Sequence, residues 1–385
     1  LEVGVRSRGY GRLRLVRIAQ LANFVGPTSG GMRTAVTALG HGYRDLGARR
    51  LLIVPGPTDA REDDDAGTIV RLRAPQVGGG YRLIVEPWRI TEALEAFAPT
   101  ALEFHDKATL LPISRWARRR GVPTTLVSHE RLDDMLALRT GLVLGSRASI
   151  AVLNRMLVRS VDRVVVTSRY AEAEFRSSAR GAGCPVVRVP LGVDLQRFAP
   201  SAWTPSPLLR LVHVGRLSRE KSPHLAVATA VELHRRGVPV RLDVYGTGPH
   251  RDELVDLAGD APVRFHGHLD DRAELARRIA EADIALSVCP GETFGLAVLE
   301  ALACGTPVLT ADRGGARELI DRTCGGWAAP DPTALADGVL ALAARLSPLL
   351  REAARVRAQA YPWSATAAHL LELHAAAVAA ADTAA

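Results

Sequence analysis

Two glutamates, Glu292 and Glu300, stand eight residues apart in the segment PGETFGLAVLEALACGTPV. The run DIALSVCP before them predicts a strand and FGLAVLEALAC predicts a helix, so Glu292 would lie on the connecting turn. Backbone N–H groups of a first helical turn, here those of Phe294, Gly295 and Leu296, lack intrahelical partners and can bind an anion. Two hydroxyl-binding carboxylates beside an anion site are typical of a site for a sugar linked to a nucleoside diphosphate. The alternative is a capped surface helix with solvated glutamates.

A second motif, VGRLSREKS, places Arg216 and Lys221 five residues apart after another predicted strand. Two cations at a strand-to-helix turn can clamp a diphosphate and stabilise its charge as it leaves. Because Arg219 and Glu220 intervene, a surface loop of mixed charge is the alternative interpretation.

Glycine turns follow several of the other predicted strands. Gly30 and Gly31 in GPTSGGMRTA would open a helix with a bare N-terminus suited to phosphate. The spacing matches neither G-x-G-x-x-G nor G-x-x-x-x-G-K-[ST], so it supports neither a dinucleotide fold nor a P-loop ATPase. Gly246 in YGTGP, and His266 with Gly267 in FHGHLD, are candidates for donor binding, the latter through a base pocket built from backbone groups.

Two histidines, His129 in VSHERLDD and His105 in EFHDK, end predicted strands in the first half of the chain. A histidine at such a position can bind a sugar hydroxyl or steer a proton, with Asp106 and Glu130 as possible helpers. The alternative is a histidine that only caps its strand. Glu318 in RGGARELI is sufficiently explained by charge stabilisation at the start of its own predicted helix.

Strand and helix patterns alternate along the chain, which favours parallel sheets with helices on both faces. A proline-rich and serine-rich stretch, RFAPSAWTPSP, interrupts this alternation and predicts an interdomain linker. The sequence therefore predicts two doubly wound α/β halves in tandem. Ligands of such sheets bind at the carboxyl ends of the strands. The predicted strands cover residues 15–24, 49–56, 68–75, 100–106, 121–130, 161–168 and 184–193, then 208–215, 240–246, 263–268, 283–289 and 306–311.

The composition suits a two-domain α/β protein: 385 residues, 47% of them hydrophobic and 5% aromatic. The four cysteines show no C-x-x-C spacing, so neither a disulfide framework nor a zinc site is implied, and Cys289 and Cys304 are expected to be buried thiols. Reduced cysteines fit a cytoplasmic location. The chain shows no 18-residue apolar run and no signal-peptide pattern.

A net charge of +8 raises the question of an anionic partner. The densest basic cluster, Arg115, Arg118, Arg119 and Arg120, lies on the predicted helix ISRWARRRG. One interpretation is a solvated arginine face. The other is peripheral docking on an anionic membrane surface, with Trp116 as an interfacial anchor. No zinc finger or RNA-binding aromatic motif is present, so nucleic acid is not an expected partner.

Together these motifs resemble the retaining family-4 glycosyltransferases of the GT-B fold, over nearly the whole chain. The resemblance is strongest in VGRLSREKS, YGTGP, FHGHLD and ETFGLAVLEALACGTPVLTADRGGARELI. Two stretches, TLLPISRWARRRGVPTTLVSHERLDD and VVRVPLGVDLQRF, are most similar to actinobacterial mannosyltransferases that build phosphatidylinositol mannosides and related lipid-linked mannans. The resemblance implies two Rossmann-like domains facing a central cleft. We expect an acceptor-side domain over 1–198, a linker over 199–207, a donor-binding domain over 208–364 and a helix over 365–385 that crosses back to the first domain.

The resemblance also implies roles for the residues of the second half. Glu292 would contact donor sugar hydroxyls near the anomeric centre, and Glu300 would hold the ribose hydroxyls of the nucleotide. Phe294, Gly295 and Leu296 would offer backbone N–H groups to sugar and phosphate.

For the rest of the site, the resemblance implies that Arg216 and Lys221 neutralise the departing diphosphate. Gly30 and Gly31 would approach the distal phosphate from the first domain, and His129 would lie on the acceptor side near the sugar. The glycine loop continues as Met32-Arg33, where many relatives have a small or valine-like residue, so acceptor-side residues do not carry over.

Enzymes of this type need neither metal nor cofactor, and the expected co-substrate is a nucleotide sugar, with GDP-mannose favoured over a UDP-sugar. No D-x-D motif ends a strand, since Asp63-Asp64-Asp65 is expected in a polar loop. Retention is thought to proceed by same-face attack, with the leaving phosphate accepting the proton of the acceptor hydroxyl. The acceptor would be a lipid-linked or small-molecule sugar.

Other functions remain open at this point. The nearest is transfer of glucose or N-acetylglucosamine from a UDP-sugar to a small-molecule acceptor. Gly291 precedes Glu292 where proline or serine is frequent, which leaves the donor sugar open. A sugar-nucleotide 2-epimerase and a phosphorylase are less favoured, for want of an acidic pair beside a base and of long insertions. A non-catalytic protein that binds sugar nucleotides is the alternative outside enzymes.

Overall fold

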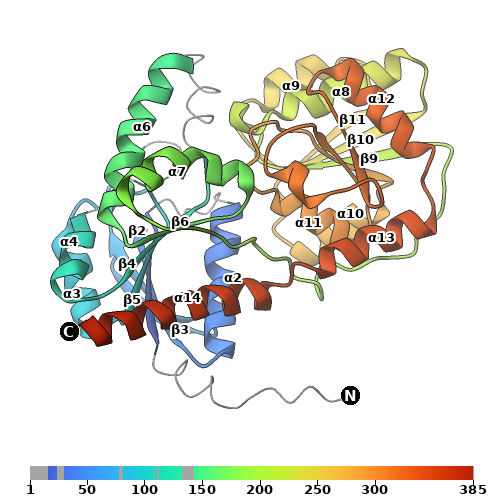
Figure 1. Cartoon of the computed structure of the whole chain (residues 1–385). Coiled ribbons are helices and arrows are strands. Elements are labelled where there is room, and N and C mark those ends of the chain that lie inside the picture. The colour runs from blue at the N-terminus through green and yellow to red at the C-terminus, as the bar shows by residue number, and fades with distance from the viewer. Residues whose placement is uncertain are drawn as a thin grey trace, which may run out of the picture.

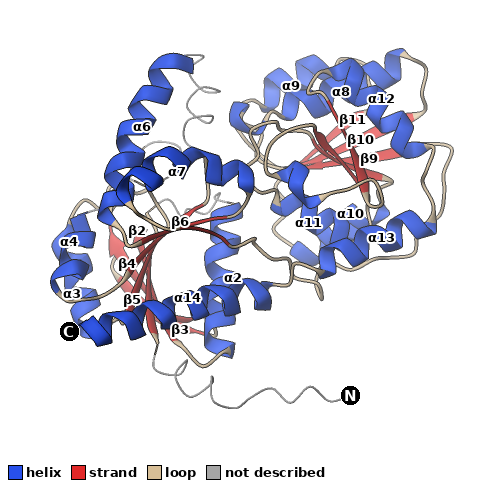
Figure 2. Cartoon of the chain, viewed as in Figure 1, coloured by secondary structure: helices blue, strands red, loops and turns tan. Residues whose placement is uncertain are grey.

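The computed structural model describes residues 16–23, 30–77, 81–107, 109–110, 112–131 and 143–384. These residues form two α/β units that lie side by side, and each has a sheet with helices on both faces (Figures 1 and 2). The predicted α/β architecture of two doubly wound halves is therefore confirmed. The start of the chain, the tip of the first glycine loop and the end of the VSHERLDD motif lie outside the described residues.

The first sheet has the strand order β3-β4-β2-β1-β5-β6-β7-β8, with β3 as its antiparallel edge and parallel pairing elsewhere. Its central strands are buried on both faces and mostly apolar, although β1, β2 and β5 carry the buried side chains of Gln20, Arg50 and Glu103. The strands are β1 (Arg17–Leu21), β2 (Arg49–Gly56), β3 (Ala60–Asp64), β4 (Gly67–Arg73), β5 (Ala101–Phe104), β6 (Thr124–Ser128), β7 (Arg163–Val166) and β8 (Val186–Arg188).

The expected polar loop around Asp63 and Asp64 was a wrong prediction, because both residues belong to β3. This strand pairs with β4 in a register that sets Asp64 opposite Gly67. The carboxylate of Asp64 accepts the N–H of Ala66 at 2.9 Å and closes the tight turn. An exposed edge strand needs no apolar residues, so a charged run such as this resembles a loop in the sequence.

Helices cover both faces of the first sheet, and a large apolar core lies between them and the strands. The helices of this unit are α2 (Gly31–Asp45), α3 (Pro87–Phe97), α4 (Pro112–Arg119), α6 (Val143–Ser160) and α7 (Arg169–Ala182).

The second sheet is entirely parallel, in the order β11-β10-β9-β12-β13-β14. Its strands are β9 (Leu209–Val214), β10 (Val240–Tyr245), β11 (Val263–Gly267), β12 (Ile284–Ser287), β13 (Val308–Ala311) and β14 (Gly325–Ala328). The helical elements are η1 (Arg219–Lys221), α8 (Pro223–Arg235), α9 (Arg251–Ala258), α10 (Arg272–Glu281), α11 (Leu296–Ala303), η2 (Ala316–Leu319), α12 (Pro332–Ala343) and α13 (Pro348–Gln359). Cys289 and Cys304 are buried and all four cysteines are free thiols, as expected.

The last helix, α14 (Trp363–Ala384), leaves the second unit and packs along α2 of the first, as predicted (Figure 1). The two helices approach closely where Gly42 faces Ala367, since a Cβ on Gly42 would lie 2.4 Å from the Ala367 Cβ. The stretch 199–207 contains no helix or strand. The exact domain limits at residues 198 and 208 stay a prediction.

Across the described residues no single helix is long and apolar enough to cross a membrane. Only α12 and α13 together, bent by 110° at their break, pass such a test of length and composition.

Candidate active site

Glu292 and Lys221 form an ion pair, with Lys221 Nζ 2.9 Å from Glu292 Oε2. Glu292 lies on the turn between β12 and α11, and Lys221 ends η1. Burial alone would raise the pKa of Glu292, but Lys221 and the backbone N–H groups of Phe294 and Thr293 outweigh it and the pKa is lowered. For Lys221, burial is likewise outweighed by Glu292, and the pKa is raised. Both groups are therefore charged at neutral pH.

The backbone N–H of Phe294 was expected to be available to a ligand. In the structure this N–H faces the Glu292 carboxylate and helps to lower its pKa, and its binding of a ligand stays a prediction. The helix begins two residues later than predicted, at Leu296, with Gly295 as its N-cap. Gly295 has a φ of 100°, and a Cβ there would lie 3.0 Å from the Cβ of Ala316, so the turn requires glycine.

Two helix N-termini meet where the units face each other. α11 begins after Gly295 and α2 begins after Gly30, and neither N-terminus has a side-chain cap or an acidic residue in its first turn. A Cβ on Gly31 would lie 3.6 Å from Cδ1 of Leu296, so the two helix starts are close neighbours. Uncapped N–H groups and aligned helix dipoles from both sides favour a bound anion at this place.

The side chain of Arg216 extends to the first unit, whereas that of Lys221 pairs with Glu292 within the second unit. Its guanidinium donates a hydrogen bond to the hydroxyl of Tyr81 and lies 5.7 Å from the centroid of that ring. Tyr81 follows β4 and is held by a backbone bond of 2.9 Å from the N–H of Val77. Sequence reasoning missed Tyr81, because no motif surrounds it.

Glu300 lies on α11 and its buried carboxylate accepts a hydrogen bond from Arg272 at the start of α10. Burial raises the pKa of Glu300, and Arg272 only partly offsets this effect. The Arg272 guanidinium also lies 5.0 Å from the ring centroid of Phe198. In addition to the hydrogen bond from Arg272, the Glu300 carboxylate can accept hydrogen bonds from two hydroxyl groups of a ligand. Arg272 was not among the predicted site residues.

The glycine turns after β10 and β11 lie together, since the N–H of Gly246 bonds the carbonyl of Gly267 at 2.7 Å. Gly246 has a φ of 144°, and a Cβ there would overlap the carbonyl oxygen of Gly215 at 1.9 Å. The side chain of His266 bonds Asp243 at 2.8 Å and stacks on Tyr245 with centroids 4.6 Å apart. Close backbone packing alone therefore accounts for the glycine at 246.

His129 and His105 contact each other directly, with His105 Nδ1 2.8 Å from His129 Nε2. The pKa of His129 is lowered to about 3, mainly by burial, and the positive charge of Lys107 acts in the same direction. Of the two expected helpers, Asp106 accepts hydrogen bonds from Thr109 and Glu130 is exposed, and a role for either stays a prediction. The partner of His129 is thus His105.

Two hydrogen-bonded contacts join the units beside Glu292. Ser168 donates to the carbonyl of Thr293 at 2.6 Å. The Glu318 carboxylate accepts the N–H groups of Arg169 and Tyr170 at 3.0 and 2.8 Å. Glu318 was expected to stabilise its own helix, but it caps α7 of the first unit, because η2 is a short 3₁₀ turn against that helix end.

The arginine-rich helix α4 carries Trp116, which was proposed as an interfacial anchor. Its partly buried ring packs on the core, lies 4.6 Å from the Arg120 guanidinium and donates from Nε1 to Glu95 at 3.3 Å, and the anchor role stays a prediction. On the neighbouring helix α3, Trp88 is 62% exposed.

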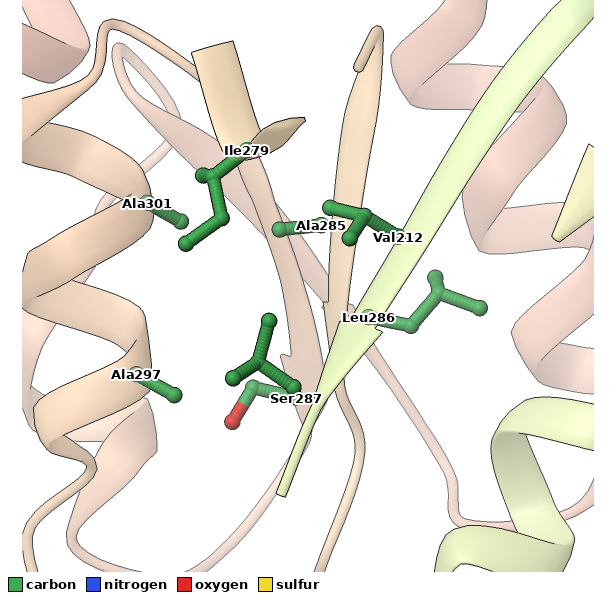
Figure 3. A pocket seen from close by; sticks show the side chains of 8 residues that line it. Val212, Ile279, Ala285, Leu286, Ser287, Ala297 and Ala301 are labelled. Atoms are coloured by element: carbon green, nitrogen blue, oxygen red, sulfur yellow. The ribbon is translucent and has the colours of Figure 1, made fainter. Parts of the chain in front are cut away.

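A small cavity of about 10 Å³ lies under α11, lined by the side chains shown in Figure 3. It can hold about one water molecule and is a packing gap rather than a substrate site. A second, polar cavity of about 180 Å³ lies on the face of β9, β10 and β11 next to α10. In the part of the chain that the structure describes, no group of three His, Cys, Asp or Glu side chains could hold a metal ion.

Comparison with known proteins gives the family. The family described as "Glycosyl transferases group 1" matches residues 209–345, and the "Glycosyl transferase 4-like domain" matches residues 30–192. A GDP-mannose-dependent alpha-(1-6)-phosphatidylinositol dimannoside mannosyltransferase of Mycobacterium tuberculosis is 38% identical over 371 residues, 92% of this chain and 95% of the relative. This chain belongs to that glycosyltransferase family.

Further comparisons agree. A GDP-mannose-dependent alpha-mannosyltransferase of Mycobacterium tuberculosis is 33% identical over 79% of the glycosyltransferase and 81% of the relative. Sucrose-phosphate synthase from Thermosynechococcus elongatus superimposes with a TM-score of 0.75 at 22% identity, covering 93% and 98% of the two chains. Anabaena HepE in complex with UDP-glucose gives a TM-score of 0.71 at 18% identity, covering 93% and 98%. The fold is therefore GT-B.

The structure of the glycosyltransferase brings some predicted site residues together and leaves others apart. Lys221 contacts Glu292, and Gly31 approaches Leu296. Among the residues that the structure describes, His129 hydrogen-bonds none of the donor side and bonds His105 of its own domain instead.

Proposed function

We propose that this glycosyltransferase is a retaining, metal-independent enzyme that moves mannose from GDP-mannose to a hydroxyl group of a mannose-bearing phosphatidylinositol glycolipid. The named activity of the 38%-identical relative, which matches along almost its full length, supports the donor and the acceptor class. The observation that carries the reaction is the Lys221–Glu292 pair beside the uncapped start of α11.

In the proposed reaction, the bond between the anomeric carbon and the diphosphate oxygen breaks, and the acceptor oxygen bonds the same face of that carbon. The proton of the acceptor hydroxyl passes to the leaving phosphate oxygen. Lys221 and Arg216 would stabilise the charge of the diphosphate, together with the N-termini of α2 and α11. Glu292 would bind donor sugar hydroxyls, and Glu300 would bind the ribose.

On the acceptor side, His129 would lie near the transferred sugar. The lipid would lie next to α3 and α4. Arg115 and Arg119 are exposed on α4 with Trp88 on α3, a combination suited to peripheral contact with an anionic membrane on its cytoplasmic side. Co-sedimentation with anionic vesicles should weaken as salt rises and should fall further in the double variant Arg115→Glu/Arg119→Glu. Equal binding to neutral vesicles would contradict this docking.

The decisive experiment measures transfer by mass spectrometry in metal-free buffer containing a lipid extract. GDP-mannose, UDP-glucose and UDP-N-acetylglucosamine are supplied separately. Release of GDP together with a mannosylated lipid is the expected result. Turnover of a UDP-sugar alone would replace the donor assignment, and nucleotide binding without turnover under all conditions would favour a non-catalytic protein.

A further inference from the structure

A buried chain of hydrogen bonds runs from the C-terminal helix α14 to His129. His374 of α14 bonds Oε1 of Glu103 at 2.6 Å, and His105 bonds Oε2 of the same carboxylate at 3.1 Å. His105 then bonds His129 at 2.8 Å, with the two rings stacked at 5.1 Å. Figure 1 shows α14 returning from the second unit to pack against α2 of the first.

Glu103 accepts hydrogen bonds from both His374 and His105 in this series, and it is fully buried. Its register partner on β1 is Gln20, whose Nε2 donates to Oε2 at 2.7 Å, and Tyr43 of α2 donates to Oε1. Burial would raise the pKa of Glu103, but the hydrogen bonds from His105 and His374 outweigh it and hold the pKa well below its ordinary value. A carboxylate only accepts hydrogen bonds, so each of its four partners donates a hydrogen bond.

This arrangement assigns the protons on the histidines. His105 carries a proton on Nε2, which faces Glu103, so a neutral His105 offers the lone pair of Nδ1 to His129. His129 must then donate from Nε2, and its Nδ1 keeps a lone pair. None of the described residues hydrogen-bonds Nδ1 of His129. This nitrogen can therefore accept a hydrogen bond from a ligand.

The charges around Glu103 favour a neutral His105. Arg50 donates to Oε1 of Gln20 at 2.7 Å and supplies one buried positive charge behind the carboxylate. A second cation at His105 would leave excess positive charge at a buried position, which is costly.

The same surroundings make His129 a poor base. Its pKa is lowered to about 3, mainly by burial; the charge of Lys107 acts in the same direction, and Glu103 opposes the change. A neutral imidazole with so low a pKa can orient a hydroxyl group through a hydrogen bond, but it holds a transferred proton weakly.

We propose that Glu103, His105 and His374 are positioning residues that hold His129 in the tautomer whose Nδ1 accepts a hydrogen bond from a sugar hydroxyl at the reacting centre. This inference rests on the proposed function, in which His129 lies near the transferred sugar. It gives the crossover helix α14 a part in the reaction in addition to its packing role.

The test compares substitutions of His374 in the full-length enzyme. His374→Leu removes the N–H donor, whereas His374→Gln keeps one, and His369→Leu changes an exposed histidine of the same helix. Without its partner on α14, the Glu103 carboxylate would draw a second proton onto His105, and His129 would switch to the form protonated on Nδ1. We expect kcat to fall about tenfold to a hundredfold in His374→Leu, with an unchanged KM for GDP-mannose. His374→Gln should recover most of this loss, and His369→Leu should resemble wild type.

The tautomer itself is read from ¹⁵N shifts of the imidazole nitrogens in histidine-labelled protein, with the His129 signals assigned through His129→Asn. The expected wild-type spectrum has an unprotonated Nδ1 on His129, and His374→Leu should show it protonated at the same pH. Glu103→Gln should have the larger effect. Because that variant places an amide among buried donors and is prone to misfold, thermal unfolding must accompany it.

Three outcomes are distinguishable. A wild-type His129 protonated on Nδ1, or a His374→Leu enzyme with unchanged kcat and tautomer, would overturn the positioning role. Full transfer activity in His129→Asn would instead remove His129 from the proposed function. The tautomer measurement would still decide whether the buried chain sets its protonation.

Discussion

The two domains hold the charged groups of the site in different ways. On the C-terminal side, Lys221–Glu292 and Arg272–Glu300 are simple pairs whose cationic side chains remain 42% and 36% exposed. On the N-terminal side, Glu103 is fully buried and distributes four donors over its two oxygens. One arrangement leaves cations accessible to an incoming anion, and the other leaves no oxygen of Glu103 to a ligand.

We infer from this difference that the C-terminal ion pairs can change partners when a charged ligand binds, whereas the network around Glu103 holds a fixed geometry. A cation that is neutralised by its own carboxylate, yet still in contact with water, can turn to a diphosphate at low desolvation cost. A fully bonded interior network is costly to break and holds its members in one arrangement. The donor side is therefore expected to reorganise on binding, whereas the acceptor side keeps its shape.

The largest effects should come from the donor side. Lys221→Ala, Arg216→Ala and Glu292→Ala should each lower kcat by about 10²- to 10³-fold, because each removes a charge aimed at the sugar or the leaving group. Lys221→Ala also deprives the Glu292 carboxylate of its cation, so burial would raise the pKa of that carboxyl. Nucleotide release and product formation are measured together by mass spectrometry.

Arg219→Ala is the matched control for these variants. Arg219 lies on the same turn as Lys221, is exposed and only approaches Glu253 at 3.7 Å. It should turn over like wild type, and all four variants should unfold near the wild-type temperature. Near-normal activity in the three donor-side variants would show that the site has been assigned to the wrong residues.

Acid stability tests the other side of the comparison. The pKa of His129 falls from 6.5 to about 3 on folding, so between these values the unfolded chain binds more protons and stability is lost as pH falls. From pH 7 to pH 5 the loss due to His129 should be about 2 kcal/mol, a figure that follows from the shift. Glu103, whose pKa is also depressed, contributes in the same direction only below its ordinary value of 4.5.

The measurement is denaturant unfolding of wild type and His129→Asn at pH 7, 6 and 5. The free energy of unfolding of the variant should depend less on pH over this range. Parallel curves for the two proteins would mean that His129 is not held neutral by the fold.

Whether a strand or a site residue could be predicted from the sequence depends on whether a local pattern of residues marks it. The strand over 49–56 was predicted with its observed limits, because a strand buried on both faces is a continuous apolar run. β3 and β14 were missed, since one is a charged edge and the other begins with two glycines. Apolar patterning predicts only the strands that the core requires.

The site shows the same limit. Lys221 and Glu292 could be selected because each lies in a short turn with its own pattern. Tyr81 lies 135 residues from its partner Arg216, and His374 lies 271 residues from Glu103. No local pattern marks such residues, because the tertiary fold alone brings their partners within bonding distance.

Tyr81 gives a smaller prediction across the domain interface. Because its hydroxyl bonds Arg216, Tyr81→Phe should remove one hydrogen bond from the guanidinium and raise KM for GDP-mannose about tenfold at most, as expected for one charge-assisted hydrogen bond. Tyr81→Ala also removes the ring that lies 5.7 Å from Arg216 and should have a larger effect. Steady-state kinetics with both variants checks this order. If Tyr81→Phe lowered KM, the tyrosine would compete with the diphosphate for Arg216 instead of orienting it.

The smallest effect is expected at Glu318, which joins the domains but belongs to neither charged pair. Its carboxylate caps α7 across the interface, so Glu318→Gln should weaken the closed arrangement by less than about 1 kcal/mol, because the group is exposed. Solution scattering should show a slightly larger radius of gyration without nucleotide and an unchanged one with saturating GDP. Glu352→Gln, at an exposed position of α13, is the control. If the unliganded variant scattered like wild type, closure would depend on the donor-side charges alone, and the N-terminal domain would contribute only its fixed geometry.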